Sequence, residues 1–409
     1  MGHGADHRRT GSRSRGGGVE PGEGLRRKPR GLRGALRQRR RGRADQRRRP
    51  SGLPARRSRI PRRSGGGSRG VGGPSRVGRA EAPGLRRRNG AHRQDALAGA
   101  VTDEAGLEVW RGGVNTWECD EMGHMNVRFY VARAMEGIAG LAGALGLEGA
   151  FKPNAEATLL VKDQHIRFIR EVRPGAALHM TAGVIEIAES EARFLLLLIH
   201  SATGGIAASF QTVVVHATAR DERPFAWSDR TRGLAEGLMA EAPAAAAPRS
   251  LLPTAVEARA SLAEAESLRL ARSGAGAFGP GDCDVFGRMR PEIFIGRVSD
   301  SVPGLARVFG GTTGADPSAR VGGAVLEYRL LHLGWPRAGD RFELRSGLAG
   351  VDRRARRVVH WLLDPATGEP WGSAEAIAVS LDLETRKILP LDEAEEARLR
   401  EAVTPGLSL

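Results

Sequence analysis

An acid, a glycine, a histidine and an asparagine stand within seven residues of one another, at Asp120, Gly123, His124 and Asn126. Apolar residues with a period near 3.6 follow over 127–141, which predicts a helix whose N-cap is Asn126. The turn therefore leads into a helix N-terminus, where unpaired backbone N–H groups and the helix dipole favour negative charge. A carboxylate and an imidazole at such a place suit chemistry on an acyl group.

Each polar residue of this turn has an expected role in that chemistry. The Asp120 carboxylate can attack an acyl carbon directly or take a proton from an attacking water. Backbone N–H groups at Gly123 and Met125 are expected to bind the oxyanion, and Gly123 lets the backbone approach the carbonyl closely. His124 is expected to polarise the carbonyl or hold a water. Asn126 caps the helix, orients Asp120, or does both.

Purely structural explanations compete with these roles. An aspartate in a glycine-containing turn before a helix is often only a cap, and Asn126 serves equally well as an N-cap alone. His124 also fits a structural hydrogen-bonding role. Further along the helix, Tyr130 fits a core contact and Glu136 a charge on the helix surface, although both also stand as weaker site candidates.

The stretch occurs a second time 164 residues later. The matched pairs are Cys119 with Cys283, Asp120 with Asp284, Gly123 with Gly287, Met125 with Met289, Arg133 with Arg297, and Leu141 with Leu305. The same offset continues without a gap as far as Val215 and Val379. A register held over about a hundred residues predicts two copies of one domain, a repeat far longer than those of solenoid proteins.

The second copy departs from the first at the turn. Arg288 replaces the histidine, Arg290 replaces the asparagine, and Pro291 opens the helix, where proline is tolerated. Two arginines beside Asp284 would lower the pKa of its carboxyl group and pair with it, which leaves a poor nucleophile. Alternatively, these arginines could bind the phosphates of coenzyme A. One main site around Asp120 is the simpler expectation.

The net charge of +16 is unevenly distributed. Residues 1–100 hold 29 Arg or Lys against 6 Asp or Glu, whereas the rest of the chain holds 34 against 41, so the part with ordered patterning is mildly acidic. Residues 1–100 have few periodic apolar positions and are expected to be disordered. A nucleic-acid-binding arm and an organelle transit peptide remain alternatives. We favour translated upstream sequence before a non-methionine start near Val101.

Deletion of residues 1–100 is expected to leave folding and activity intact, because no position in this segment is patterned as core. Solubility and turnover of the truncated chain test this, and an insoluble or inactive product would contradict it.

The remaining chain reads as domain 1 at 104–220, a linker at 221–266 and domain 2 at 267–395. Helices are expected at 127–146, 229–240 and 292–309, with 261–270 either a helix or the first strand of the second copy. Strands are expected at 107–114, 162–171, 177–187, 192–200, 206–218, 324–333, 341–348, 356–363 and 374–383. One early helix followed by an antiparallel meander makes each copy an α+β domain.

The residues D-E-M-G-H-M-N at Asp120–Asn126, Tyr130, Glu136, and H-I-R-F-I-R-E-V-R-P-G at His165–Gly175 resemble the 4-hydroxybenzoyl-CoA-thioesterase-like family. The resemblance covers 108–218 well and 269–391 more weakly. It implies a double-hotdog protein: two tandem hotdog domains, each an antiparallel curled sheet around a central helix. It also implies an acyl site at the interface between the copies, with Asp120 as nucleophile or general base on a thioester.

The expected activity is therefore hydrolysis of an acyl-CoA thioester, or of an acyl carrier protein thioester, at one main site. An enoyl-thioester hydratase or dehydratase and a non-catalytic acyl-CoA-binding protein are the alternatives. The histidines and cysteines show no ligand spacing, so no metal or other cofactor is expected. Without a long apolar run or a signal peptide, we expect a soluble cytoplasmic protein with no membrane partner. Nucleic acid is not an expected partner of the folded part, and homo-oligomers of the double-hotdog unit remain open.

Overall fold

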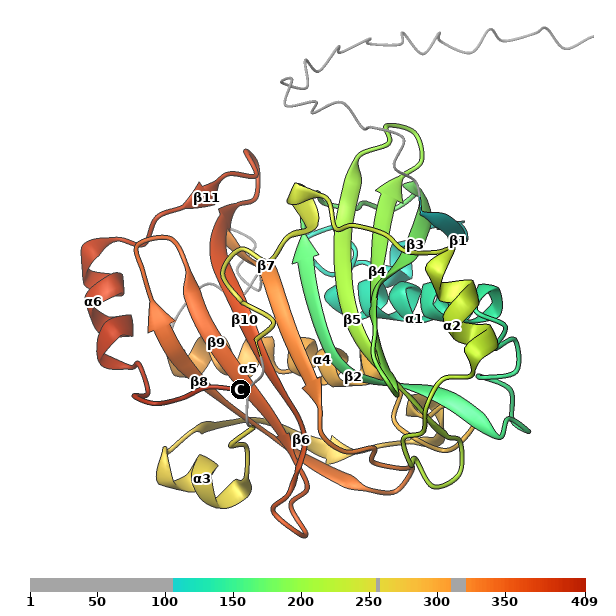
Figure 1. Ribbon diagram of the computed structural model, residues 1–409. Helices are drawn as coiled ribbons and strands as arrows, with labels where there is room; N and C mark the ends of the chain where they lie inside the picture. Colours follow the sequence, from blue (N-terminus) through green and yellow to red (C-terminus); the bar gives the residue numbers. More distant parts are fainter. Residues whose placement is uncertain (1–105, 255–257, 310–320) are drawn as a thin grey trace, which may run out of the picture. The chain divides into compact units, whose positions relative to one another are not determined.

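The computed structural model describes residues 106–254, 258–309 and 321–409, so the predictions made for residues 1–100 lie outside the described part (Figure 1). The elements of the first copy are β1 (Leu107–Gly113), η1 (Thr116–Glu118), α1 (Val127–Ala144), β2 (Ala157–Phe168), β3 (Ala177–Ile187), β4 (Glu191–His200) and β5 (Ile206–Thr218). Those of the second copy are β6 (Ala271–Ala277), η3 (Pro280–Asp282), α4 (Pro291–Asp300), α5 (Val302–Phe309), β7 (Val321–His332), β8 (Arg341–Val351), β9 (Arg356–Leu363), β10 (Pro370–Asp382), β11 (Ile388–Leu389) and α6 (Glu393–Glu401). Between the copies lie α2 (Asp229–Glu236), η2 (Ala244–Ala246) and α3 (Leu262–Ser267).

The strands form one antiparallel sheet in the order β1-β3-β4-β5-β2-β7-β10-β9-β8-β6, with β11 paired to β10. The order of the second copy mirrors that of the first, and the copies meet where β2 pairs with β7. The bounds of β6, β7, β8 and β10 are those of β1, β2, β3 and β5 moved by 164 residues. The predicted α+β organisation in two repeated units is confirmed, and the predicted register extends over whole copies.

Helix α1 forms because its apolar residues recur on one face and Asn126 caps its first turn. The Asn126 side chain accepts a hydrogen bond from the backbone N–H of Arg128, which satisfies one of the donors that a helix start leaves unpaired. The buried face of α1 consists of Tyr130, Val131, Ala134, Gly137, Ile138, Leu141 and Ala142. Each large apolar side chain buried there contributes about 1.5–3 kcal/mol.

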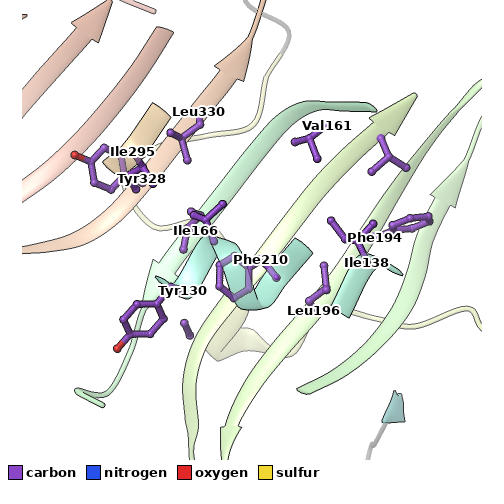
Figure 2. Close-up of a cluster of buried hydrophobic side chains, with 14 of the residues drawn as sticks. Tyr130, Ile138, Val161, Ile166, Phe194, Leu196, Phe210, Ile295, Tyr328 and Leu330 are labelled. Carbon is purple, nitrogen blue, oxygen red and sulfur yellow. The ribbon is translucent and has the colours of Figure 1, made fainter. Parts of the chain in front are cut away.

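One hydrophobic core extends through both copies. Figure 2 shows side chains of this core that come from α1, β2, β4 and β5 of the first copy and from α4 and β7 of the second. Those labelled are Tyr130, Ile138, Val161, Ile166, Phe194, Leu196, Phe210, Ile295, Tyr328 and Leu330. Because the core is shared, the copies are expected to unfold as a single cooperative unit.

Helices α1 and α4 lie on the same face of the sheet and contact each other (Figure 1). The Asn126 amide nitrogen donates to the Ser299 hydroxyl at 2.8 Å, which links the start of α1 to the end of α4. Nearby, a Cβ atom at Gly296 would lie 3.0 Å from Cδ of Arg128, so the arginine stem passes directly over this glycine. The absence of a side chain at Gly296 therefore permits the close approach.

Several predicted elements differ from the structure in their extent, and the largest differences are in the helix at 292–309 and in β2. The helix expected at 292–309 is interrupted at Ser301, whose hydroxyl donates to the Arg297 carbonyl. Pro303 follows, and it lacks the N–H that a continuous helix would use to donate to the Ser299 carbonyl. Strand β2 begins at Ala157, five residues before the predicted start, because 158–161 is buried without alternation. Of the two alternatives for 261–270, the structure has the helix, α3, and the lead-in strand is β6.

In the segment expected to be a linker, α2 packs into the core beside α1, whereas the residues after it, including Ala242 and Ala246, pack on the opposite face of the sheet (Figure 1). Beneath these residues lie buried charged side chains at the junction of β2 and β7. His165 and Glu327 are 2.6 Å apart, and the Glu327 carboxylate also accepts the backbone N–H groups of Arg249 and Ser250. Arg329 pairs with Asp163 at 2.7 Å and donates to the carbonyls of Leu252 and Thr254. The linker therefore supplies the remaining hydrogen bonds that these buried charges require.

No helix in the described part of the chain is both long enough and apolar enough to cross a bilayer.

Candidate active site

The residues from Cys119 to Met125 form a tight turn directly before α1. Cys119 and Met125 pair as an isolated antiparallel bridge, and the Asp120 N–H donates to the His124 carbonyl at 3.0 Å. Gly123 has a φ of +76°, a left-handed conformation that glycine adopts without a steric penalty. Among the described residues, no heavy atom beyond the two chain neighbours lies within 4 Å of the position that a Cβ atom would take there. The turn therefore leaves open space in front of Gly123.

The predicted carboxylate and imidazole lie together in this turn. One oxygen of Asp120, Oδ1, accepts the Met122 N–H at 3.0 Å, and the other, Oδ2, lies 3.1 Å from Nδ1 of His124. The two side chains are 14% and 15% exposed, so they are largely shielded and yet still reach the surface. Burial lowers the pKa of His124, but the adjacent Asp120 carboxylate and the more distant Glu171 outweigh it, so the pKa is raised overall. The raised pKa favours an imidazolium beside the carboxylate.

This pKa shift predicts how stability depends on pH. A group whose pKa is raised by folding stabilises the fold below its unfolded pKa, about 6.5 for histidine, and loses that contribution as pH rises through the folded pKa. We expect wild type to lose its stability advantage over His124→Gln as pH rises from about 6 to 8. Urea unfolding of both proteins at several pH values measures this difference, and a difference that grows with pH would contradict the assignment.

Two of the backbone N–H groups expected to bind the oxyanion are already hydrogen-bonded within the protein. The Gly123 N–H already donates to the Asp120 carbonyl at 3.0 Å, and the Met125 N–H to the Val172 carbonyl at 2.8 Å. Neither group is available to a ligand in this arrangement. Within the described residues, the N–H of His124 has no acceptor, whereas its equivalent in the second copy, at Arg288, donates to Asp284 Oδ1 at 2.9 Å. The donor left open in the first copy is therefore that of His124.

Two weaker candidates lie on α1. Tyr130 is 4% exposed and packs edge-on against Phe168, and burial raises the pKa of its hydroxyl group. Glu136 is 46% exposed and pairs with Arg133 at 2.7 Å. The structure thus places Tyr130 in the core and Glu136 in a surface ion pair. Asn126 caps α1 and bonds to Ser299 in the other copy.

The equivalent carboxylate in the second copy is fully occupied. Asp284 Oδ1 accepts the N–H groups of Phe286 and Arg288, each at 2.9 Å, and Oδ2 accepts Nε and Nη2 of Arg288 at 3.1 and 2.9 Å. The Arg288 side chain is 3% exposed and also lies over the Phe286 ring, 4.5 Å from its centroid. Four donors, two on each oxygen, hold the carboxylate in one orientation.

Arg290 occupies the N-cap position of α4 but makes no cap with its side chain. It donates instead to the Gly281 carbonyl at 2.7 Å and pairs with Glu292 at 3.1 Å. Arg288 is buried against Asp284, whereas the Arg290 side chain is 39% exposed. Contact of these arginines with coenzyme A stays a prediction, and the exposure favours Arg290 for it.

In each copy, an acid directly before the turn pairs with an arginine on the following helix. The sequence analysis did not predict this ion pair. Arg133 on α1 pairs with Glu118, a 3% exposed side chain in η1 directly before the turn. The second copy repeats this pair with Arg297 and Asp282 at 2.8 Å. The signal was present in the sequence, because an acid and an arginine fifteen residues apart recur at the offset of 164.

The comparisons with known proteins agree with this architecture. A sequence model described as the thioesterase-like superfamily matches residues 114–240 and again 278–400. The two matched segments follow the two structural copies. No curated protein matches the chain.

Two solved structures share the fold. A protein from Lactobacillus plantarum, provisionally named an oleoyl thioesterase, has a TM-score of 0.51 and 12% identity, over 68% of this chain and 97% of that one. The 12:0-ACP thioesterase from Umbellularia californica has a TM-score of 0.51 and 12% identity, over 66% of this chain and 92% of that one. Each structure matches more residues of this chain than one copy contains, so the likeness includes the arrangement of the two copies. The chain belongs to the thioesterase-like superfamily and carries its hotdog domain twice in tandem.

Proposed function

We propose that this protein hydrolyses acyl thioesters of coenzyme A or of an acyl carrier protein at one main site around Asp120, where the two copies meet. The observation that carries the proposal is the turn itself. The carboxylate of Asp120 lies 3.1 Å from the imidazole of His124, beside an unpaired N–H and the open space before Gly123. Membership of the thioesterase-like superfamily supports the same reaction class.

In this proposal Asp120 acts as the general base. Its carboxylate takes a proton from a water molecule, whose oxygen forms a bond to the thioester carbon. The carbonyl oxygen becomes an oxyanion, which the backbone N–H and the imidazole of His124 stabilise. The C–S bond then breaks, the thiolate sulfur takes the proton held by Asp120, and a carboxylic acid and a thiol are released. Direct attack by the carboxylate, through an anhydride that water then hydrolyses, is the covalent form of the same reaction.

The chemistry of the turn distinguishes the copies. Asp120 accepts one backbone N–H at Oδ1 and faces His124 at Oδ2, whereas both oxygens of Asp284 are bonded to donors of the second copy. A carboxylate bonded to a guanidinium at 2.9 and 3.1 Å is a weaker base and a poorer nucleophile. We therefore assign turnover to the first copy.

A hydrolysis screen on the full chain tests the proposal. Short, long, aromatic and quaternary-ammonium acyl-CoAs are incubated with the protein, and the released thiol is measured with a thiol reagent. Acyl carrier protein thioesters are included because the protein from Umbellularia californica is a 12:0-ACP thioesterase. Thiol release that disappears in Asp120→Asn supports the proposal. Loss of enoyl absorbance without thiol release would identify a hydratase. Binding of an acyl-CoA without either change would identify a non-catalytic protein.

A further inference from the structure

An arginine of the second copy contacts the turn that holds Asp120 in the first. Nη2 of Arg386 donates to the backbone carbonyl of Met122 at 3.1 Å, and Nη1 lies 3.4 Å from an oxygen of Glu171. The Arg386 side chain is 26% exposed, so most of it is enclosed. The N–H of the same Met122 donates to Asp120 Oδ1 at 3.0 Å. Arg386 thus bonds to the residue whose own N–H orients the carboxylate.

The backbone of Arg386 is in a conformation that arginine rarely adopts. It lies in the turn between β10 and β11 with a φ of +57°, and its N–H donates to the Asp382 carbonyl at 2.8 Å. Glycine or asparagine adopts this left-handed conformation at a lower free-energy cost. A side chain that remains at a strained position points to a role for that side chain.

The mirror position shows what changes between the copies. Glu222, 164 residues earlier, has nearly the same φ of +59° and pairs with Arg337 at 3.0 Å. Arg337 in turn donates to the Phe286 carbonyl at 2.9 Å, and Phe286 is the equivalent of Met122. In both copies an arginine therefore donates to the backbone carbonyl at this point of the turn. The turn of the second copy is bonded by Arg337, which also belongs to the second copy. The turn of the first copy is bonded by Arg386, which belongs to the second copy.

The surroundings of Met122 also come from the second copy. A Cβ atom at Gly322, at the start of β7, would lie 2.6 Å from the Met122 sulfur and 2.7 Å from Cδ2 of Leu383. Gly322 therefore leaves the space that the Met122 side chain fills at the start of β7. The turn of the first copy thus lies against the second copy and is bonded to it through Arg386.

We propose that Arg386 is a positioning residue for the site at Asp120. By holding the Met122 peptide it fixes the Asp120 carboxylate relative to His124, and it makes turnover in the first copy depend on the second. This inference rests on the proposed function. The arginine does not have to touch the thioester, so its effect falls on the turnover number and not on substrate affinity. A small displacement of a reacting group is enough to slow catalysis strongly.

Arg386→Gly separates positioning from structural support. Glycine relieves the left-handed backbone, so the melting temperature should stay the same or rise. The Met122 carbonyl loses its donor, so kcat should fall about 10- to 100-fold while KM changes less than about 3-fold. Arg386→Lys keeps one donor and should restore part of the turnover. Glu222→Gly is the matched control, because it relieves the same backbone strain at the mirror position and should leave kcat unchanged.

Steady-state kinetics and thermal unfolding are measured on the full-length variants. Wild-type kcat in Arg386→Gly, or an equal loss in Glu222→Gly, would overturn the positioning role. A change in KM alone would make Arg386 a substrate contact and would also overturn it. Full turnover in Asp120→Asn would mean that the proposed function fails. An inactive Asp120→Asn beside a fully active Arg386→Gly would refute only the positioning role. Absence of turnover in wild type would refute both.

Discussion

Asp120→Asn is expected to lower the turnover number at least ~100-fold, whereas Asp284→Asn should change it less than ~10-fold. Asparagine has nearly the same shape, and its side-chain oxygen can still accept the Met122 N–H that Asp120 Oδ1 accepts. An amide cannot, however, take a proton from water or attack an acyl carbon. The loss in Asp120→Asn should therefore be in kcat, with the fold intact.

Asp284→Asn is the matched control for that experiment. It removes a carboxylate from the same turn of the other copy but leaves Arg288, 3% exposed, without its charged partner. We expect this variant to lose stability while it keeps most of its turnover. Steady-state kinetics on the two purified proteins distinguish the assignments. Equal losses would mean two working sites, and a fully active Asp120→Asn would mean that the catalytic residue lies elsewhere.

Glu327→Ala is expected to lower the free energy of unfolding by about 3–5 kcal/mol, the scale for removing a buried carboxylate and leaving its hydrogen-bond donors unpaired. Glu327 is 3% exposed, and its removal leaves His165 and the N–H groups of Arg249 and Ser250 without an acceptor. Burial raises the pKa of Glu327, but hydrogen bonds from His165 and the two N–H groups outweigh it, so the pKa is lowered overall. Its stabilising contribution is therefore present above about pH 4.3 and lost as pH falls further.

Urea unfolding of Glu327→Ala and of Glu369→Ala tests this prediction. Glu369 is exposed in the hairpin between β9 and β10, so its removal should change stability by less than about 0.5 kcal/mol. If both variants unfold at the same urea concentration as wild type, the pair with His165 contributes nothing and the linker is held by other contacts. A loss confined to Glu327→Ala supports the assignment.

Local signals were sufficient to predict the repeated elements. Strands β3, β5 and β9 have their predicted bounds because alternating apolar residues are flanked there by turn residues. The start of α1 was also predictable, since Asn126 precedes a regular apolar period. The break at Ser301 was missed because the apolar period continues through it, although Pro303 was a visible warning.

Contacts between the copies could not be predicted in the same way. The pair of Arg329 with Asp163 joins residues 166 apart, and the bond from Arg386 to Met122 joins residues 264 apart. Neither pair has a local sequence pattern, because each depends on how two strand ends meet in space. The availability of backbone donors was likewise hidden, because it depends on carbonyls such as that of Val172. The residue types at the site were therefore predictable, and their partners were not.

The mirrored order of strands across the junction of β2 and β7 has a consequence for how such a protein can evolve. In a homodimer of single hotdog chains, every substitution appears in both subunits. One subunit therefore cannot lose its catalytic carboxylate while the other keeps it. Joining the halves in one chain removes that constraint. One half can then exchange an imidazole for a guanidinium, as at Arg288, while the other keeps its histidine. Because the halves share one polypeptide, their pairing also does not weaken on dilution.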